Sequence, residues 1–202
     1  MSNFEQGIGK YFKEAELAKI RGVRVGIAGA GGLGSNCAMT LVRCGFLDFL
    51  VVDYDLVENS NLNRQFFFGD QVGMTKVAAL KENLLRINPD VRVEAVNLKI
   101  GKDTIKELFE TCDVVVEAFD EVVFKKLIVE TYMSSEKLLV AASGIGGWGN
   151  SDNIKIQKVR DTFYIVGDSV SEVNDDCPPV SPSVMIAAAK QADVVLTYVL
   201  RD

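Results

Sequence analysis

The stretch Gly29-Ala30-Gly31-Gly32-Leu33-Gly34 decides the fold, because it fits the pattern G-x-G-x-x-G between a predicted strand and a predicted helix. Residues 23–28 are a compact apolar run, and residues 35–44 have helical spacing. Glycines permit a tight turn and a close approach to phosphate, and the following helix offers unpaired N–H groups. We therefore predict a nucleotide site at this turn; the alternative is a turn that serves only helix–strand packing.

An acidic residue ends the next predicted strand. Residues 49–52 are apolar and lead directly to Asp53. A carboxylate at this position accepts hydrogen bonds from ribose hydroxyl groups. Because ATP and NAD both carry a ribose with two hydroxyls, the glycine turn and Asp53 predict a nucleotide without saying which one.

Apolar runs alternate with helical patterns through residue 142, which predicts an α/β fold with a Rossmann-like, mostly parallel sheet and helices on both faces. The C-terminal part adds a predicted hairpin of antiparallel strands. No repeat or linker is visible, so we expect one domain over residues 1–202. The other predicted elements are helices at 5–20, 74–87, 102–110, 122–133 and 183–200, and strands at 91–98, 113–118, 137–142, 154–159 and 162–166.

Composition argues against several classes of function. A formal charge of −6 disfavours binding to nucleic acid or to an anionic membrane. The absence of histidine excludes a Ser-His-Asp triad and a histidine-ligated metal. No signal peptide and no apolar stretch that would span a bilayer is recognised, so we expect a cytoplasmic protein.

The four cysteines give no metal-binding pattern. Cys37, Cys44, Cys112 and Cys177 include no Cys-x-x-Cys pair, so we predict no zinc site and no redox dithiol. The first three fall on predicted helices or beside a predicted strand. We expect them to be reduced, buried thiols.

Further short segments follow the glycine turn along the chain. In order they are Asp53-Tyr54-Asp55, Ser60-Asn61-Leu62-Asn63-Arg64-Gln65, Gly73-Met74-Thr75-Lys76, Ile87-Asn88-Pro89, Glu117-Ala118-Phe119-Asp120 and Ala141-Ala142-Ser143-Gly144. Together with the glycine turn, these segments resemble the ThiF/MoeB/ubiquitin-activating enzyme superfamily. The Asn-Leu-Asn-Arg-Gln run is the most specific, because dinucleotide dehydrogenases have nothing like it at that place. The last two segments look like those of a short subgroup of ThiF proteins.

The resemblance implies that the nucleotide is ATP and that Mg²⁺ accompanies it. By position, Asp53 would hold the ribose, Asp120 would hold Mg²⁺, and Arg64 and Lys76 would contact the triphosphate. The catalytic residues implied in this way are Arg64, Lys76 and Asp120. The nucleotide-contacting residues are Gly29, Gly31, Gly32, Gly34, Asp53, Asn61, Arg64, Gln65 and Lys76.

The chemistry of the side chains agrees with these roles. Arg64 and Lys76 follow the carboxyl ends of strands, where open α/β sheets bind ligands. Arginine clamps phosphate oxygens through two N–H groups, and lysine acts as a point charge. Asp120 ends the fourth predicted strand, and a carboxylate is a ligand that Mg²⁺ prefers. The alternative for both cations is a solvated surface charge; Asp55, Glu58 and Glu121 are interpreted as surface acids.

The resemblance also implies the reaction. It is adenylation of the C-terminal carboxylate of a small ubiquitin-like, ThiS-like sulfur-carrier protein that ends in Gly-Gly, with release of pyrophosphate. A sulfur donor, thiamine biosynthesis and a homodimer are further expectations. The attacking carboxylate is already ionised at pH 7, so the reaction needs no histidine base. The glycine-rich residues 143–149, with Trp148, could receive the tail; a plain flexible loop is the alternative.

The chain departs from the family pattern in places. Larger members supply an N-terminal arginine to the neighbouring subunit, but no arginine precedes Arg21, so the role is vacant or passes to Lys10. Glu121 stands after Asp120, where asparagine is frequent.

Cys177 falls near the position at which some relatives carry a thiol that accepts the acyl group. Asp175 and Asp176 precede it, and negative neighbours disfavour a thiolate. A bystander thiol is therefore the alternative, and an external sulfur donor would then attack the acyl-adenylate.

Three other functions stay open from the sequence. The first is adenylation of another carboxylate, carried by a peptide or a tRNA. The second is an NAD(P)-dependent oxidoreductase, which the glycine turn and Asp53 allow but the Asn61–Gln65 run disfavours. The third is a nucleotide sensor without catalytic activity.

Overall fold

The computed structural model describes residues 2–201 and has one sheet of seven strands at its centre. The sheet order is β3-β2-β1-β4-β5-β7-β6. Every neighbouring pair is parallel except β6 with β7. The α/β, mostly parallel fold is therefore confirmed. The strands are β1 (Arg24–Ala28), β2 (Asp48–Asp53), β3 (Arg92–Asn97), β4 (Val114–Glu117), β5 (Leu138–Ala142), β6 (Lys155–Arg160) and β7 (Phe163–Gly167).

The predicted C-terminal hairpin exists and its two strands are antiparallel. Within it, β7 pairs in parallel with β5, so β6 alone runs against the rest of the sheet. All six residues of β6 are exposed, because it forms the edge of the sheet.

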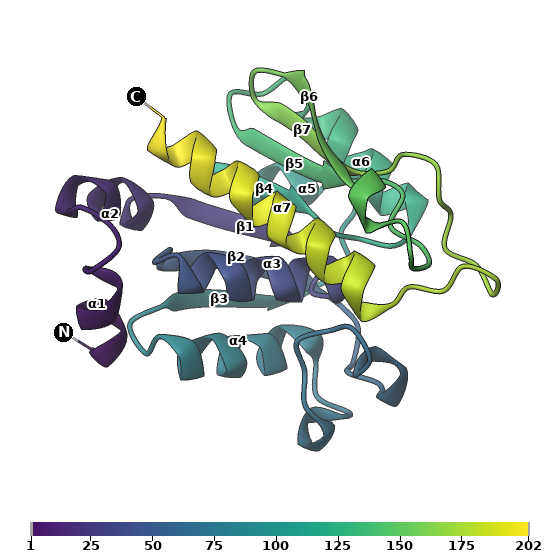
Figure 1. The fold of residues 1–202 in the computed structure, drawn as a ribbon, viewed down its shortest axis with the longest axis horizontal. Coiled ribbons are helices and arrows are strands. Elements are labelled where there is room, and N and C mark those ends of the chain that lie inside the picture. Colours follow the sequence, from purple (N-terminus) through teal and green to yellow (C-terminus); the bar gives the residue numbers. More distant parts are fainter. Residues whose placement is uncertain (1, 202) are drawn as a thin grey trace.

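Three helices share one core with one face of the sheet: α3 (Gly32–Arg43), α4 (Lys76–Ile87) and α7 (Ser181–Leu200). In Figure 1, α3 and α7 lie in front of the strands, and α4 runs along β3 at the lower edge. Alternate strand residues point to this face and bury their side chains against the helices. Ile27 of β1 and Leu41 of α3 belong to this core and are fully buried.

The other face is covered by α5 (Ile105–Leu108) and α6 (Val122–Tyr132). Its core contains Val115 of β4 and Ile128 of α6, both fully buried. The predicted helix at 102–110 shrinks to the four residues of α5. A turn in which Thr104 bonds Gly101 occupies its first part.

The predicted helix at 5–20 is two helices, α1 (Asn3–Ile8) and α2 (Glu14–Arg21), at the left of Figure 1. Gly9 caps the first, and the Glu16 carboxylate accepts the Lys13 N–H at the start of the second. Both helices pack near Gly45, before β2, and so lie at the amino ends of the strands. Three 3₁₀ turns cover Asn59–Asn61, Gly69–Gln71 and Ser151–Asn153.

Helix α7 alone, within the described residues, is long and apolar enough to cross a membrane by length and composition. Its most apolar stretch of 18 residues has a mean hydropathy of 1.4, and 44% of that stretch is buried. Ala187, Ala188 and Val195 of this helix lie in the core formed with α3. Helix α7 therefore has the character of a core helix of this domain.

Candidate functional site

A cavity of about 890 Å³ opens at the carboxyl edge of the sheet. Its walls include residues that directly follow β1, β2, β4 and β5. Strands β1 and β4 are neighbours, and the chain leaves β1 toward β2 on the other side, so the strand order reverses here. Ligands of open α/β sheets bind at such a point, and the volume is typical of ligand sites.

The glycine turn forms one wall, and its glycines have different structural reasons. Gly29 has φ +102°, and a Cβ there would lie 2.8 Å from the Ala118 carbonyl oxygen. A Cβ on Gly34 would collide with the Gly29 carbonyl, and one on Gly32 would lie 2.9 Å from Val184 of α7. These three glycines therefore serve close packing as well.

Gly31 differs from the other glycines of the turn. It precedes the first turn of α3, and a Cβ there would meet nothing closer than Gln65 Nε2 at 3.9 Å. Gly31, Gly32 and Leu33 all line the cavity, so the amino end of α3 opens onto it. Unpaired N–H groups at a helix start bind phosphate.

Asp53 is buried at the end of β2 and lines the cavity. Its two carboxylate oxygens accept N–H groups from Ala30, at 2.6 Å, and from Asp55, at 2.8 Å. Burial raises the pKa of Asp53, and the two N–H groups and nearby Lys76 oppose this shift. Asp53 therefore anchors the glycine turn at the cavity wall.

Lys76 is buried at the start of α4, and its Nζ forms an ion pair of 2.6 Å with Asp55. The Lys76 N–H also donates to the Asp55 carbonyl, at 2.9 Å. Both side chains line the cavity. The interpretation of Asp55 as a plain surface acid is wrong, because its carboxylate holds the lysine in place.

Arg64 and Gln65 line the cavity, whereas the nearby Asn61 does not. Arg64 Nη1 donates to the Ser60 carbonyl, at 2.9 Å, which holds the guanidinium at the wall. Gln65 Oε1 is buried and finds no hydrogen bond among the described residues, as expected of a group that a ligand or water satisfies. Asn61 is buried, and its Oδ1 accepts the Glu58 N–H at 3.1 Å.

Asp120 follows β4, is exposed and lines the cavity. Its carboxylate accepts no hydrogen bond from any residue between 2 and 201. No group of three or more acidic, cysteine or histidine side chains within that range could hold a metal ion. Mg²⁺ is usually held by one or two carboxylates together with substrate phosphates, so Asp120 fits an ion that arrives with a nucleotide.

The sequence analysis missed an ion pair between Glu117 and Lys125 at the cavity wall. Glu117 is 1% exposed, and Lys125 Nζ lies 2.9 and 3.1 Å from its two oxygens. Burial raises the pKa of Glu117, and Lys125 opposes the shift. The sequence did offer a signal for this site, because Glu117 is an acidic residue at the end of a strand that otherwise contains only valine.

Glu121 also bonds across the cavity. The Tyr54 hydroxyl donates to its Oε1 at 2.6 Å, which links the end of β2 to the start of α6. This hydrogen bond raises the pKa of Tyr54 to about 12. Lys99 Nζ lies 4.8 Å from the centre of the Tyr54 ring. Glu121 is exposed, as predicted, but it is one of the cavity residues.

Cys177 is half-buried and is absent from the cavity wall, although Pro179 of the same loop lines it. A Cβ on Gly147 would lie 2.8 Å from Cys177 Sγ, and the Gly147 N–H donates to the Pro178 carbonyl at 3.0 Å. The thiol therefore packs on the glycine-rich loop. Trp148 of that loop is exposed.

The other three cysteines are reduced. Cys37 and Cys112 are buried, as predicted. Cys44 was also predicted to be buried, but it is only half-buried. Burial raises the pKa of the Cys112 thiol to about 11. These thiols therefore belong to the packing of the fold.

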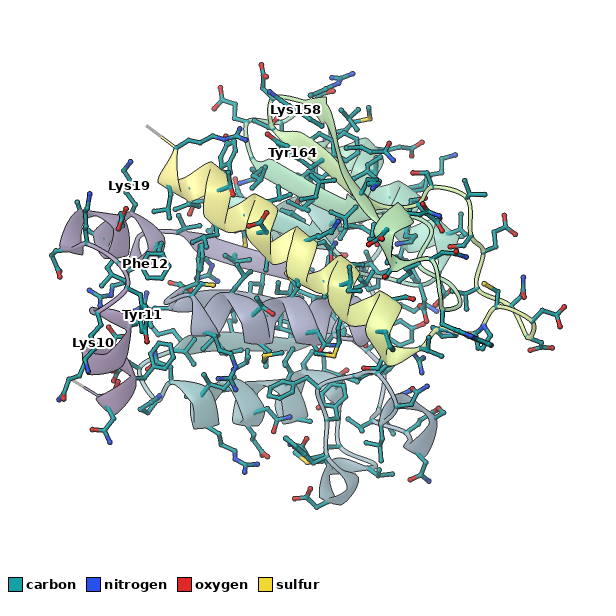
Figure 2. The ribbon with its side chains drawn as sticks, viewed as in Figure 1. Lys10, Tyr11, Phe12, Lys19, Lys158 and Tyr164 are labelled. Atoms are coloured by element: carbon teal, nitrogen blue, oxygen red, sulfur yellow. The ribbon has the colours of Figure 1, made fainter. Side chains whose placement is uncertain are left out.

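Lys10 is exposed between α1 and α2. Figure 2 shows it at the left, away from the start of α7 and from the glycine turn. Within one chain it is therefore far from the site.

A model of the ThiF family matches residues 5–202 of the chain. Ubiquitin-like modifier-activating enzyme 5 of Oryza sativa subsp. japonica is 50% identical over 93 residues, which are 46% of this chain and 21% of that protein. The Caenorhabditis elegans protein of the same name is 41% identical over 96 residues, or 48% and 22% of the two chains. The alignments thus span about a fifth of these relatives.

Solved structures share the fold. The E. coli tRNA N6-threonylcarbamoyladenosine dehydratase TcdA, in complex with AMP, has a TM-score of 0.84 and 21% identity over 96% of this chain and 93% of its own. E. coli MccB, crystallised with AMPCPP and MccA, has a TM-score of 0.71 and 21% identity over 91% of this chain and 57% of its own. At these identities the likeness concerns the fold.

Proposed function

We propose that this chain, which belongs to the ThiF family, is an ATP-dependent adenylyltransferase that activates the C-terminal carboxylate of a small ubiquitin-like protein. One observation carries the proposal: Arg64, Lys76 and Asp120 line one cavity with the glycine turn and Asp53. Two cations and a carboxylate beside a helix start suit a triphosphate and its divalent ion.

The nucleotide would lie across the end of β1. Asp53 receives the ribose hydroxyls, and the first turn of α3 receives a phosphate. Arg64 and Lys76 hold the other phosphate oxygens, and Lys76 then shares its charge between phosphate and Asp55. The side chains fix the phosphates in line with the incoming carboxylate, which lowers the entropic part of the barrier.

An oxygen of the substrate carboxylate attacks the α-phosphorus, and the bond to the bridging oxygen of pyrophosphate breaks. No proton moves, because the nucleophile is ionised at pH 7. Arg64 and Lys76 stabilise charge on the phosphate oxygens as the bond breaks. Mg²⁺, held by Asp120 and phosphate, would supply further positive charge there.

The wall of the cavity is not made only of the residues assigned to the nucleotide. Val129 of α6 and Phe163 and Ile165 of β7 line it as well. These apolar walls favour an extended peptide tail that reaches the α-phosphate. Val122 and Val123 at the start of α6 are 76% and 70% exposed beside this opening, which suits contact with a protein.

The partner class rests on the relatives named ubiquitin-like modifier-activating enzymes. Within that class we propose a ThiS-like sulfur carrier that ends in Gly-Gly, with a sulfur donor as a later partner and thiamine biosynthesis as the pathway. We also propose a cytoplasmic homodimer in which a second copy completes the site, with Lys10 as the residue to test. We place any role of the Cys177 thiol after adenylation.

A second candidate is adenylation of a carboxylate borne by tRNA. The near full-length likeness to TcdA, over 96% and 93% of the two chains, favours it. The net charge of −6 argues against it, because a tRNA-binding surface needs clustered cations. The ubiquitin-like partner is therefore the first proposal.

The test is ATP–pyrophosphate exchange with a ubiquitin-like protein captured by this chain. We expect exchange that needs Mg²⁺ and the partner and is lost in Arg64→Ala. Arg43→Ala, at the exposed far end of α3, is the matched control and keeps the exchange. Exchange at the wild-type rate in Arg64→Ala would refute the site, and exchange driven by tRNA would favour the second candidate.

A further inference from the structure

We propose that Glu117 and Lys125 form a positioning pair that fixes the turn carrying Asp120, and that this pair thereby sets the affinity of the site for the divalent ion bound with ATP. The inference rests on the proposed function. Lys125, one member of the pair, lies outside the segments that carry the family resemblance.

The Glu117 carboxylate holds the chain on both sides of Asp120. Its Oε1 accepts the N–H of Phe119, the residue before Asp120, at 2.8 Å. Lys125, in the first part of α6 after Asp120, donates to both oxygens. The turn that carries Asp120 is therefore closed around one carboxylate, and it cannot shift without breaking a charged hydrogen bond.

The same carboxylate ties this turn to the neighbouring strand and loop. Its Oε2 accepts the Ala142 N–H at the end of β5, at 3.4 Å. The Glu117 carbonyl accepts Nε2 of Gln191 from α7, at 3.1 Å. The carbonyl oxygen of the next residue, Ala118, approaches the glycine turn so closely that a Cβ on Gly29 would lie 2.8 Å from it. Glu117 therefore places Asp120 relative to the glycine turn.

A contribution to stability alone does not explain why Glu117 and Lys125 are paired, because the Glu117 charge is buried. Glu117 is 1% exposed, so its charge is almost fully removed from water, while Lys125 is 26% exposed at the cavity wall. Replacement of such a buried pair by apolar side chains is often neutral or stabilising. The position of the pair beside Asp120 is thus the informative feature.

Asp120 itself has no hydrogen-bonded support within residues 2–201. Its direction depends on the backbone that Glu117 and Lys125 hold. In metal sites, removal of a group that hydrogen-bonds to a metal ligand and orients it typically lowers metal affinity about 10–100-fold. We therefore expect an effect of this size from a pair that never touches the ion.

The experiment measures Mn²⁺ binding by electron paramagnetic resonance, with the full chain and a non-hydrolysable ATP analogue. Lys125→Met should weaken Mn²⁺ binding by about tenfold or more. Lys125→Arg should stay within about twofold of the wild type, because a guanidinium can bond both carboxylate oxygens.

The matched control is Arg21→Met. Arg21 of α2 pairs with Glu5 of α1, and both helices lie at the left of Figure 1, away from α6. The two side chains are 27% and 9% exposed, against 26% and 1% for Lys125 and Glu117. The substitution Arg21→Met should lower thermal stability and leave the affinity for Mn²⁺ unchanged. If Lys125→Met does not fold, Glu117→Gln combined with Lys125→Met removes both charges and is measured instead.

The outcomes separate the two proposals. A wild-type chain that binds neither the analogue nor Mn²⁺ defeats the proposed function itself. A wild type that binds both, with wild-type Mn²⁺ affinity in folded Lys125→Met or in the double variant, overturns the positioning role alone. Equal losses in Arg21→Met and Lys125→Met would also overturn it, because they would reflect general destabilisation.

Discussion

Lys76 Nζ lies 2.6 Å from a carboxylate oxygen of Asp55, so the cation proposed to bind phosphate already has an anionic partner in the protein. The pair holds a long, flexible side chain at the cavity wall before any ligand arrives. Part of the entropic cost of ordering the lysine is therefore met on folding. A phosphate then shares a charge that is already in place.

The first prediction concerns this lysine. Lys76→Met should weaken ATP binding by about tenfold or more, because a charged hydrogen bond typically contributes about 1.5–3 kcal/mol. Isothermal titration calorimetry measures it. Lys81→Met, on the exposed side of the same helix, is the control. Equal affinities in the two variants would show that Lys76 is a structural residue only.

The second prediction separates two glycines of one turn. Gly34→Ala places a Cβ against the Gly29 carbonyl and should destabilise the fold by about 1–3 kcal/mol or more. Gly31→Ala meets nothing closer than 3.9 Å and should keep its stability but lose ATP affinity. Urea unfolding and ATP titration of both variants test this. Normal ATP binding by Gly31→Ala would contradict a phosphate at the start of α3.

The third prediction is a pH dependence. Burial raises the pKa of Asp53 above 3.8, so the folded state binds its proton more tightly than the unfolded state. The contribution of this group to stability is therefore greatest below 3.8 and is lost as pH rises through the raised pKa. The Asp53→Asn variant has no carboxyl group that titrates at this position. Its free energy of unfolding should therefore increase relative to that of the wild type as pH rises from 3.8. If the difference in free energy of unfolding between the two proteins were the same at every pH, the raised pKa of Asp53 would be contradicted.

The fourth prediction concerns Cys177, which packs on Gly147 and stands outside the cavity wall. Cys177→Ser should retain ATP–pyrophosphate exchange within about twofold, since adenylation does not need the thiol. Loss of exchange in a folded Cys177→Ser protein would place the thiol in the first step. A non-reducing gel of the reaction with the partner shows separately whether an acyl thioester forms.

Local patterns predicted the parts of the molecule that local physics determines. The glycine turn and Asp53 could be read from the sequence because a strand, a tight turn and a helix are adjacent in the chain. Their structural setting is as expected, with Asp53 bonded to Ala30 of the turn. The structure also shows that Gly29 and Gly34 are required by packing, which spacing alone does not reveal.

Contacts between different elements were not predicted. Glu117 meets Lys125, eight residues later, because α6 folds back over β4, and Asp55 meets Lys76 because α4 starts beside β2. The hairpin pattern likewise did not show that β7 would join β5 in parallel, because the pairing partner lies outside the hairpin. In each case the contact depends on how two elements are placed relative to each other, which a local pattern does not give.

The most direct test of the central claim is the intact mass of a captured ubiquitin-like protein after incubation with this chain, ATP and Mg²⁺. The account predicts that the partner gains one adenylyl group with the wild type and none with Arg64→Ala. A partner of unchanged mass, with a wild-type chain that demonstrably binds ATP and the partner, would contradict it.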